Sequence, residues 1–537
     1  MRVRSILGVS LFLSVVSVYA QQQPPQPQVP AQPNQPIELP EFIVTGKERV
    51  DIPGGAKQAP VRPPLLSASA LDSLNPTLKQ PLPPLPPRQL PLPERSLLFR
   101  PGYVEASFGN YVTPNVLAGY SFEAGGYRID AAGAFEASQG WIENADYSKF
   151  DIRLLSSYVA PEKFIFFGGS TTEVDLSLGN RSYRLFGAPG NENRSVLAAL
   201  AGVNVDGKYG DLNYQAGATW SHLGMSTEGR SDIAGSTMSG YAVFEQRWNG
   251  VDAGGKIDLR FASLDNTSYP FLEGSVFARF VTDVVRLRAG AGFQSFESTT
   301  DIGRGGLLIS ASADVMALPE LTIRADLRSG LTPFSWQDLV RENPYIATNV
   351  VLDAAYDILD LSGTVLFHPS SRITASAGVR LLRRDREAVW IGDTVGTFLP
   401  AYVTVTRIDV PVDIRWILSA RDVVTADMRL TMSDVVDAKS QPYLPSLRAS
   451  VQHDRVWSPD VRSLIGLIYV GERWADLQNT VSLSGYIDVR ARVDVRIHND
   501  FTVFASTDNL LGSSVVLWRG YTERAMFVRA GITWNMP

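Results

Sequence analysis

The sequence contains no cysteine and only four histidines among its 537 residues. The lack of cysteine excludes disulfide bonds, thiolate metal sites, a cysteine nucleophile and an acylated N-terminal cysteine. The histidines are dispersed without the paired spacing of a metal site, at His222, His368, His453 and His498. We therefore expect no metal, no cofactor and no catalytic residue, and we predict that the protein is not an enzyme.

The sequence also lacks long hydrophobic runs and basic blocks. No stretch after residue 20 approaches the roughly eighteen uninterrupted apolar residues that a membrane-spanning helix needs. The formal net charge is −6, and lysine and arginine are spread along the chain. These features exclude a helical membrane anchor and argue against nucleic acid as a partner.

The first twenty residues have the order of a cleavable secretory signal. Arg2 and Arg4 precede the apolar run 6–18, and small residues close the segment at Ala20. This order predicts a signal peptide over residues 1–20 and a mature chain that begins near Gln21.

Residues 21–98 form a proline-rich segment, which holds 19 of the 34 prolines of the chain. Proline cannot donate a backbone hydrogen bond to a helix or a sheet, so we predict an extended or disordered segment in the periplasm. One stretch within it, ELPEFIVTGKE at 38–48, differs because it contains strand-forming residues.

Residues 99–537 alternate between apolar and polar side chains with a period of two. The clearest examples are 321–328, 407–418, 424–433, 486–498 and 526–534. This period predicts β-strands with one apolar face and one polar face. Several of these strands are long enough, at about nine to eleven residues, to cross a bilayer with a tilt.

Aromatic residues gather near the ends of the predicted strands, as expected for the two interfacial girdles of a membrane barrel. They are Trp141, Tyr147, Trp248, Tyr269, Phe271, Phe334, Trp336, Trp390, Trp416, Tyr469, Trp474, Tyr486, Trp518, Tyr521 and Trp534. In the long segments, Trp336, Tyr345, Trp390, Phe398 and Tyr402 are also candidates for contacting a ligand at the cell surface.

The expected connections alternate in length. Tight turns are predicted at 125–126, 249–250 and 498–500, and long loops at 330–349, 384–400 and 434–446. This pattern predicts an all-β fold, a transmembrane up-and-down antiparallel β-barrel of about 16–22 strands over residues 99–537. Such a sheet must close because lipid leaves no partner for an open edge.

Two predicted strands carry rows of mixed charge on their polar faces. The candidates for lining the lumen are Arg407, Asp409, Asp413, Arg415, Asp488, Arg490, Arg492, Asp494 and Arg496. Inward rings of charge set selectivity in pores. The alternative is a structural ladder of cross-strand ion pairs, which the balanced signs favour.

Four segments near the C-terminus carry motifs: QPYLPSLRASV at 441–451, SLIGLIYVGERW at 463–474, GYIDVRARVDVRI at 485–497 and FTVFASTDNLLGSSVVLWRGYTERAMFVRAGITW at 501–534. They resemble the closing strands of TonB-dependent outer-membrane receptors. The family's Tyr-x-Pro, Tyr-x-Gly-x-Arg, Asn-Leu and Gly-Tyr motifs match Tyr443, Pro445, Tyr469, Gly471, Arg473, Asn509, Leu510, Gly520 and Tyr521. The resemblance is close over 441–534 and extends over the rest of the barrel by pattern only.

The resemblance gives a candidate role to residues 38–48. In the family, a short TonB box precedes a globular plug domain, and Glu41, Phe42, Ile43, Val44 and Thr45 are similar to that region. An extended peptide of this kind can add a strand to a sheet of a TonB-like or other periplasmic partner. The residues between this stretch and the barrel are too few for the family's plug, so we predict that the plug domain is missing.

Three functions remain open. The first is solute uptake or passage across the outer membrane, with plug function supplied by the proline-rich segment or by another chain. The second is a passive porin-like channel, and the third is a non-conducting structural or adhesive barrel that docks a periplasmic partner. In each case we expect outer-membrane lipid and lipopolysaccharide as surroundings, and the solute is unknown.

Overall fold

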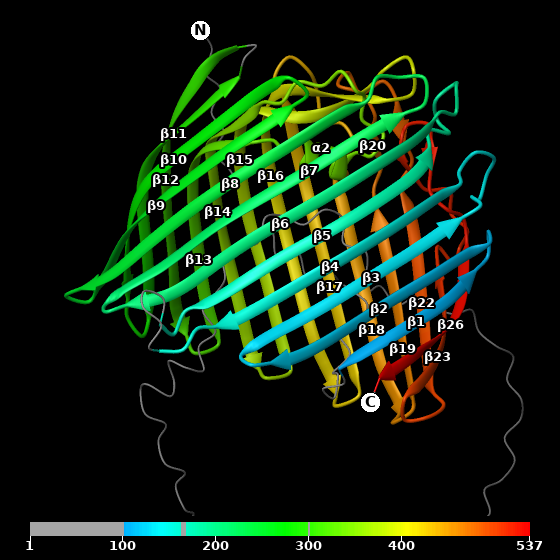
Figure 1. Ribbon diagram of the computed structural model, residues 1–537, viewed down its shortest axis with the longest axis horizontal. Helices are drawn as coiled ribbons and strands as arrows, with labels where there is room; N and C mark the ends of the chain where they lie inside the picture. Colours follow the sequence, from blue (N-terminus) through cyan, green and yellow to red (C-terminus); the bar gives the residue numbers. More distant parts are fainter. Residues whose placement is uncertain (1–100, 163–167, 299–300, 537) are drawn as a thin grey trace, which may run out of the picture. The chain divides into compact units, whose positions relative to one another are not determined.

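A computed structural model describes residues 101–162, 168–298 and 301–536. In this part of the chain, 22 strands form one antiparallel sheet. The sheet closes because β1 (Gly102–Gly109) pairs with β2 (Thr113–Ala124) on one side and with β26 (Phe527–Met536) on the other. Figure 1 shows the strands running obliquely around this ring. The predicted up-and-down barrel is confirmed, and its strand number lies at the upper limit of the predicted range.

The remaining strands of the barrel follow one another around the sheet in chain order. They are β3 (Tyr127–Ser138), β4 (Tyr147–Val159), β5 (Thr171–Arg184), β6 (Asn193–Tyr209), β7 (Leu212–Thr227), β8 (Ile233–Trp248), β9 (Val251–Leu264), β10 (Thr267–Val281), β11 (Val285–Ser298), β12 (Asp301–Leu318), β13 (Leu321–Pro333), β14 (Ala354–Ser370), β15 (Ile373–Gly392), β16 (Phe398–Ser419), β17 (Asp422–Val435), β18 (Leu447–Ser458), β19 (Val461–Val470), β22 (Tyr486–Arg496) and β23 (Phe501–Asp508).

Three short elements lie outside this sheet, in the connections. They are the helix α2 (Trp336–Glu342), the hairpin of β20 (Arg473–Trp474) with β21 (Ser482–Leu483), and the hairpin of β24 (Val516–Trp518) with β25 (Tyr521–Thr522). Among the described residues, no helix has the length and apolar character needed to cross a membrane.

The alternation predicted from the sequence divides the barrel into an apolar outer face and a polar inner face. In β17, Met428, Leu430 and Met432 are exposed on the outside. On the opposite face of the same sheet, Thr431 donates a hydrogen bond to Asp409 of β16 over 2.8 Å. An apolar surface that continues around a barrel is stable in lipid rather than in water.

The two ends of the barrel differ in the length of their connections. The end that holds the C-terminus, drawn at the bottom of Figure 1, has tight turns such as Gly125-Gly126 and Asn249-Gly250, where all four residues have positive φ. The opposite end, called the upper end below, has the long connections 334–353, 436–446, 471–485 and 509–526. The predicted contrast between short turns and long loops is confirmed.

One predicted loop is wrong. The segment 384–400 is mostly strand, because β15 continues to Gly392 and β16 begins at Phe398. Ala388, Val389 and Trp390 are buried in succession, so both faces of this strand are covered. A strand buried on both faces shows no alternation, which is why the sequence pattern did not reveal it.

The predicted aromatic girdle is correct for some residues and wrong for others. Trp248, Trp416 and Trp534 are exposed on the outer face, as a girdle requires. A second group is buried in a hydrophobic cluster and includes Trp336, Trp390, Tyr269, Phe271 and Tyr521. These side chains do not face lipid, because they pack against the loops inside the upper end.

Candidate functional site in the barrel lumen

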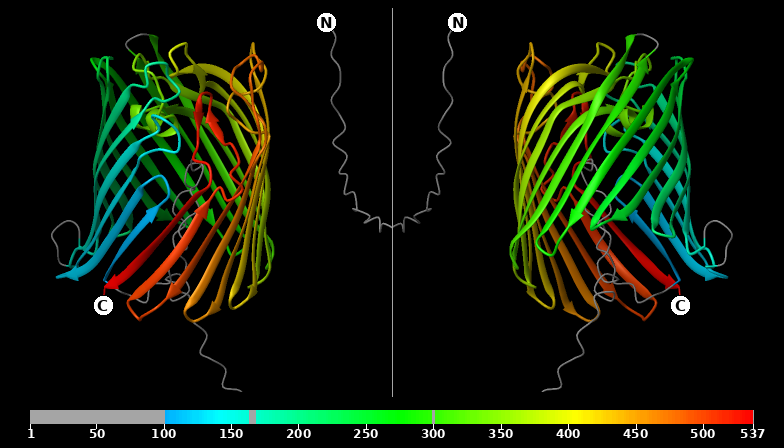
Figure 2. Two further views of the ribbon diagram at one scale, coloured as in Figure 1. Left: turned by 90° about the vertical axis from the view of Figure 1, so that its right-hand side faces the viewer. Right: turned by 90° about the vertical axis from the view of Figure 1, so that its left-hand side faces the viewer.

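The connection between β13 and β14, residues 334–353, folds into the barrel and is called the inner loop below. It contains α2, whose Trp336, Leu339 and Val340 belong to the hydrophobic cluster. Figure 2 shows α2 within the ring of strands near its upper end. The inner loop therefore occupies part of the lumen.

Local sequence explains why a helix forms here. Ser335 is the N-cap, and its hydroxyl accepts a hydrogen bond from the backbone N–H of Asp338 over 3.1 Å. Asp338 places an acidic group in the first turn and Arg341 a basic group in the last turn, which matches the helix dipole. The helix ends at Asn343, which has an extended backbone.

A bulge in β13 lies just before the inner loop, between Arg328 and Gly330. Gly330 has a φ of +153°, and a Cβ there would lie 2.6 Å from Oε1 of Gln294. The same amide oxygen accepts a hydrogen bond from the backbone N–H of Leu331 over 2.6 Å, and its NH₂ group donates to Glu273. Glycine is required here because any side chain would displace this buried amide.

The helix α2 packs against the inner wall at a glycine, Gly235 of β8, which leaves room for the Trp336 side chain. A Cβ on Gly235 of β8 would lie 2.8 Å from Cβ of Trp336. The Trp336 side chain is only 1% exposed. Beside it, Gln337 donates to the carbonyl of Gly235 and accepts from the Thr237 hydroxyl, both over 3.3 Å.

A buried arginine holds the chain that follows α2. Arg194 of β6 is 0% exposed, and its Nη1 donates to the carbonyls of Pro344 over 2.9 Å and of Ile346 over 2.8 Å. The Tyr183 hydroxyl donates to the same Pro344 carbonyl over 2.6 Å. Charged hydrogen bonds in a dry site are worth more than neutral ones, so they fix the loop firmly.

Other upper connections pack onto the inner loop from the far side of the lumen. The rings of Tyr345 and Tyr521 stack with centroids 3.5 Å apart, and the Tyr521 hydroxyl donates to the Gly396 carbonyl over 2.7 Å. Backbone hydrogen bonds join Ala347 and Tyr345 to Phe398. Burial raises the pKa of the Tyr345 phenol well above its ordinary value, so this ring stays neutral in the packed cluster.

These contacts make the upper mouth narrower than the ring of strands, and they make it rigid. A packed hydrophobic cluster does not deform continuously, because each displaced side chain loses its dispersion contacts. The inner loop is thus a fixed element inside the upper end of the barrel.

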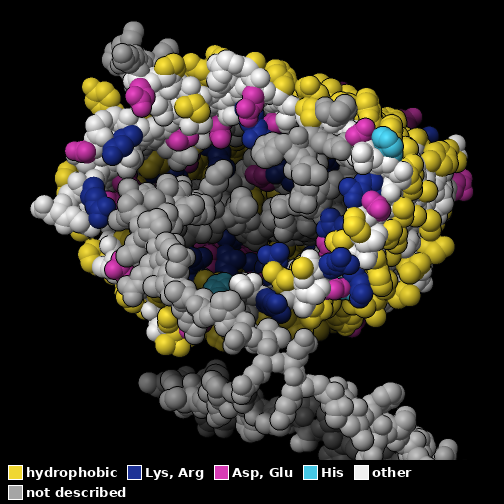
Figure 3. Space-filling model, turned by 90° about the horizontal axis from the view of Figure 1, so that it is seen from below, with side chains coloured by type: hydrophobic (Ala, Val, Ile, Leu, Met, Phe, Trp, Pro, Cys, Tyr) yellow, Lys and Arg dark blue, Asp and Glu magenta, His cyan; other side chains and the backbone are white. Residues whose placement is uncertain are grey.

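The charged residues predicted to line the lumen carry ion pairs along the polar face of the sheet. Arg407 pairs with Asp409 over 3.1 Å and Arg490 with Asp488 over 2.6 Å. Arg492 pairs with both Asp494 and Glu105, over 2.9 and 3.1 Å. Arg496 pairs with Asp460. Asp413 accepts a hydrogen bond from Ser376. Arg415 lies opposite Thr374 and Thr425 in the sheet. Figure 3 shows charged side chains gathered inside the ring and hydrophobic ones outside it.

Arg407–Asp409, Arg490–Asp488 and Arg492–Asp494 join residues two apart on one strand, whereas Arg492–Glu105 crosses between strands. Both a structural ladder and a role in selectivity stay predictions. The candidate partner-binding residues Glu41 to Thr45 lie outside the described residues. So do the predicted signal peptide and the rest of the proline-rich segment.

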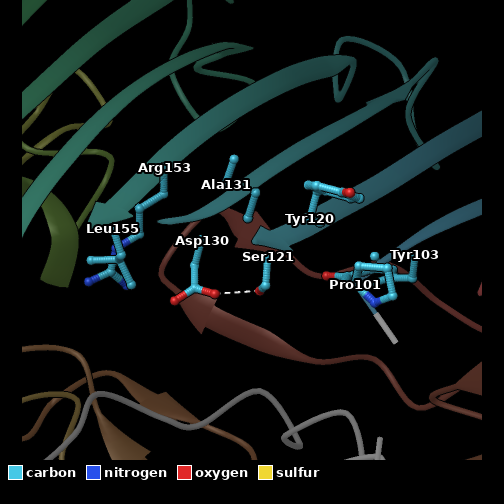
Figure 4. Close-up of a pocket in the computed structure, with 11 residues that line it drawn as sticks. Pro101, Tyr103, Tyr120, Ser121, Asp130, Ala131, Arg153 and Leu155 are labelled. Atoms are coloured by element: carbon cyan, nitrogen blue, oxygen red, sulfur yellow. Dashed lines mark hydrogen bonds between the residues drawn. The ribbon is translucent and has the colours of Figure 1, made fainter. Parts of the chain in front are cut away.

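A small pocket of about 190 Å³ lies near the lower end, on β1 to β4 (Figure 4). Its lining includes Tyr103, whose ring covers Gly119 so closely that a Cβ there would lie 2.6 Å from the ring. Its charged groups are already paired, since Ser121 donates to Asp130, and Arg153 pairs with Asp175 of β5 over 2.8 Å. Within the described ranges, no group of three or more metal-ligating side chains is present.

The inner loop was not foreseen from the sequence as an inward-folded element. One local signal for its helix exists, because Ser335 followed by Asp338 is an N-cap pattern directly before apolar residues. No local signal identifies Gly235 or Arg194, whose partners lie a hundred or more residues away in the chain.

Comparison with known proteins identifies the fold. No protein-family model and no curated protein matches the sequence. Among solved structures, the FrpB iron transporter from Neisseria meningitidis is similar with a TM-score of 0.65 and 9% identity, over 81% of this chain and 81% of that one. The barrel has the fold of the TonB-dependent outer-membrane receptors.

Two further structures share this receptor fold. The ferric-catecholate import receptor Fiu from E. coli K12 has a TM-score of 0.61 and 9% identity, over 81% of each chain. The ferric yersiniabactin uptake receptor FyuA from Yersinia pestis has a TM-score of 0.61 and 11% identity, over 81% of this chain and 80% of that one. The resemblance seen in the closing strands is thereby confirmed at the level of fold. The proteins that share it are transporters and receptors rather than enzymes.

Proposed function

We propose that the protein takes up or passes a solute across the outer membrane. The observation that carries this proposal is a closed barrel of 22 strands with a polar, charged inner wall and a packed loop inside its upper end. A barrel built only to anchor a partner needs no internal constriction. The receptor fold supports the same conclusion, because the similar proteins are named as a transporter and as import and uptake receptors.

We further propose that residues 21–98 supply what a plug domain supplies in the receptor family, or recruit a chain that does. In this arrangement the signal peptide 1–20 directs export, and the proline-rich segment lies in the periplasm. Residues 41–45 then offer a strand to a TonB-like or other periplasmic partner.

Deleting residues 21–98 should open the barrel. If this segment closes the lumen, the full chain stays closed in a planar bilayer and the deleted chain conducts. Conductance of both forms, inserted at equal protein amounts, is the measurement. A deletion variant as silent as the full chain would contradict the proposed passage of solutes.

The variant Ile43→Pro should abolish partner docking through residues 41–45. Proline removes a backbone donor from the added strand, so pairing with a sheet edge is lost. The measurement is co-purification of periplasmic partners with the full chain, alongside solute uptake by cells. As a matched control, Ile37→Pro adds a proline next to Pro36 outside the stretch. Docking and uptake that survive Ile43→Pro would disprove this role.

A passive porin-like channel is the second candidate. The observation that favours it is that residues 101–536, apart from the short gaps, contain barrel strands and their connections but no plug domain. Steady open conductance of the full chain, unchanged by the deletion of 21–98, would select this function.

A further inference from the structure

Two arginines on the inner wall break the pattern of paired charges. Many other arginines on this wall have carboxylate partners, as in Arg324 with Asp314 over 2.6 Å and Arg380 with Asp360 over 2.7 Å. Arg429 of β17 and Arg448 of β18 instead lie directly opposite each other in the sheet. The described part of the chain places no carboxylate within ion-pair distance of either one.

Both arginines point to the lumen side of the sheet. Arg429 shares its strand face with Asp427 and Thr431, while Met428 and Leu430 on the other face are exposed toward lipid. Arg448 shares its face with Ser450, whose hydroxyl donates to Asp427. Like charges directly opposite each other on a sheet are destabilising, so this pair needs a counter-charge.

A third arginine lies close by and is short of a partner. Arg473 is 5% exposed, and its Nη2 donates to the Val516 carbonyl over 2.6 Å. Its Nε, buried, has no hydrogen-bond partner. The Arg473 guanidinium lies 5.5 Å from the ring centre of Tyr486, and Arg448 also acts electrostatically on the Tyr486 phenol. A buried guanidinium nitrogen without an acceptor is costly, so Arg473 would gain from an anion that supplies one.

The neighbouring carboxylates are already engaged elsewhere. Asp488 is paired with Arg490 and accepts a hydrogen bond from the backbone N–H of Asn509 over 2.8 Å. Asp427 accepts the hydrogen bond from Ser450. Neither one forms an ion pair with Arg429 or Arg448, although Asp427, two residues before Arg429 on the same face, keeps its negative charge.

We propose that Arg429, Arg448 and Arg473, with Tyr486, form an anion site in the lumen that binds a small solute bearing carboxylate or phosphate groups. Guanidinium groups bind such oxyanions with paired, charge-assisted hydrogen bonds. The site lies on strands that end at the connections 436–446 and 471–485, so a solute would meet it just inside the upper mouth. This inference rests on the proposed function, since it names the class of solute, but binding to the site requires no passage.

Isothermal titration of the full chain in detergent, with inorganic pyrophosphate and with malonate, tests the proposal. At low salt, at least one probe binds the wild type, and binding weakens as KCl is added. The double variant Arg429→Gln/Arg448→Gln lowers affinity at least about tenfold, because two charged donors are lost. Arg415→Gln is the matched control, because Arg415 lies on the same inner wall opposite threonines, and it leaves affinity unchanged.

A melting experiment separates this site from a structural role. Without anion, the double variant melts at the same temperature as the wild type or higher, because the repulsion is removed, and pyrophosphate raises only the wild-type melting temperature. The proposal is overturned if neither probe binds the wild type, if the double variant binds as well as the wild type, or if the empty double variant melts at a lower temperature. Binding by the full chain, together with a silent variant that lacks residues 21–98, would keep the site and overturn the proposed passage instead.

Discussion

Replacing Gly235 by valine should widen the upper mouth of the barrel. The valine side chain would occupy the place of Trp336, since even a Cβ at this position lies 2.8 Å from it. Overfilling a packed site costs about 1–3 kcal/mol. The substitution destabilises the contact between α2 and the wall but not the hydrogen bonds between the strands. We therefore expect the inner loop to detach while the strands stay paired.

The expected result is that larger solutes enter. Swelling of liposomes that hold the chain without residues 21–98, measured with sugars of increasing size, should show a higher size limit for Gly235→Val. Hydrogen exchange of residues 336–347 should rise in the same variant, because the contacts that protect the helix are lost.

Gly202→Val provides the matched control. Gly202 also lies on the inner wall, in β6, but its nearest neighbour to an added Cβ is the Thr219 hydroxyl at 3.5 Å, an ordinary contact. This variant should keep both the wild-type size limit and slow exchange in the inner loop. Fast exchange in Gly235→Val with an unchanged size limit would show that the inner loop is not the constriction.

Replacing Arg492 by methionine should weaken the closure of the barrel more than the loss of any surface ion pair. Arg492 of β22 reaches across the face of Phe504 in β23, 3.8 Å from its ring centre, to Glu105 in β1. The same Glu105 carboxylate accepts a hydrogen bond from Thr533 of β26 over 3.0 Å. The first strand and the last three of the sheet are thus tied together by one buried cluster.

Removing one partner from a buried ion pair typically costs about 3–5 kcal/mol, because the other charge stays buried without compensation. For Arg492→Met, we expect the folded, compact form on cold SDS gels to convert to the unfolded form at a lower temperature. The fraction of protein that inserts and folds in vesicles should fall as well.

Arg496→Met tests whether burial is the reason. Arg496 lies on the same strand and pairs with Asp460 over 2.9 Å, but both side chains are largely exposed. Exposed pairs contribute at most about 1 kcal/mol, so this variant should unfold at nearly the wild-type temperature. An equal loss of stability in the two variants would contradict the conclusion that the buried cluster around Arg492 holds the first and last strands together.

The inner loop also affects how the lumen can open. Trp336 packs against Gly235 within the hydrophobic cluster, and Arg194 donates to two backbone carbonyls of the loop. Opening the mouth by moving this loop would expose the cluster to water, at about 25 cal/mol for each Å² of apolar surface. This cost argues against an opening that moves the inner loop.

The sequence by itself determined the class of fold. The two-residue alternation of strands such as 424–433 is a local property, because successive side chains of a strand point to opposite faces. Together with tight turns such as Gly125-Gly126, it was enough to predict a closed antiparallel barrel with a polar interior. The closing strands over 441–534 were enough to indicate the receptor fold.

Only the tertiary structure decided which way the long connection 334–353 turns and which charges lack a partner. The sequence predicts Trp336 as an interfacial aromatic. In the structure it packs against Gly235, which lies about a hundred residues earlier in the chain. That Arg429 and Arg448 lie opposite each other follows only from the register of β17 and β18. Burial and pairing of this kind depend on residues brought together by closure of the barrel, and no local pattern in the sequence records them.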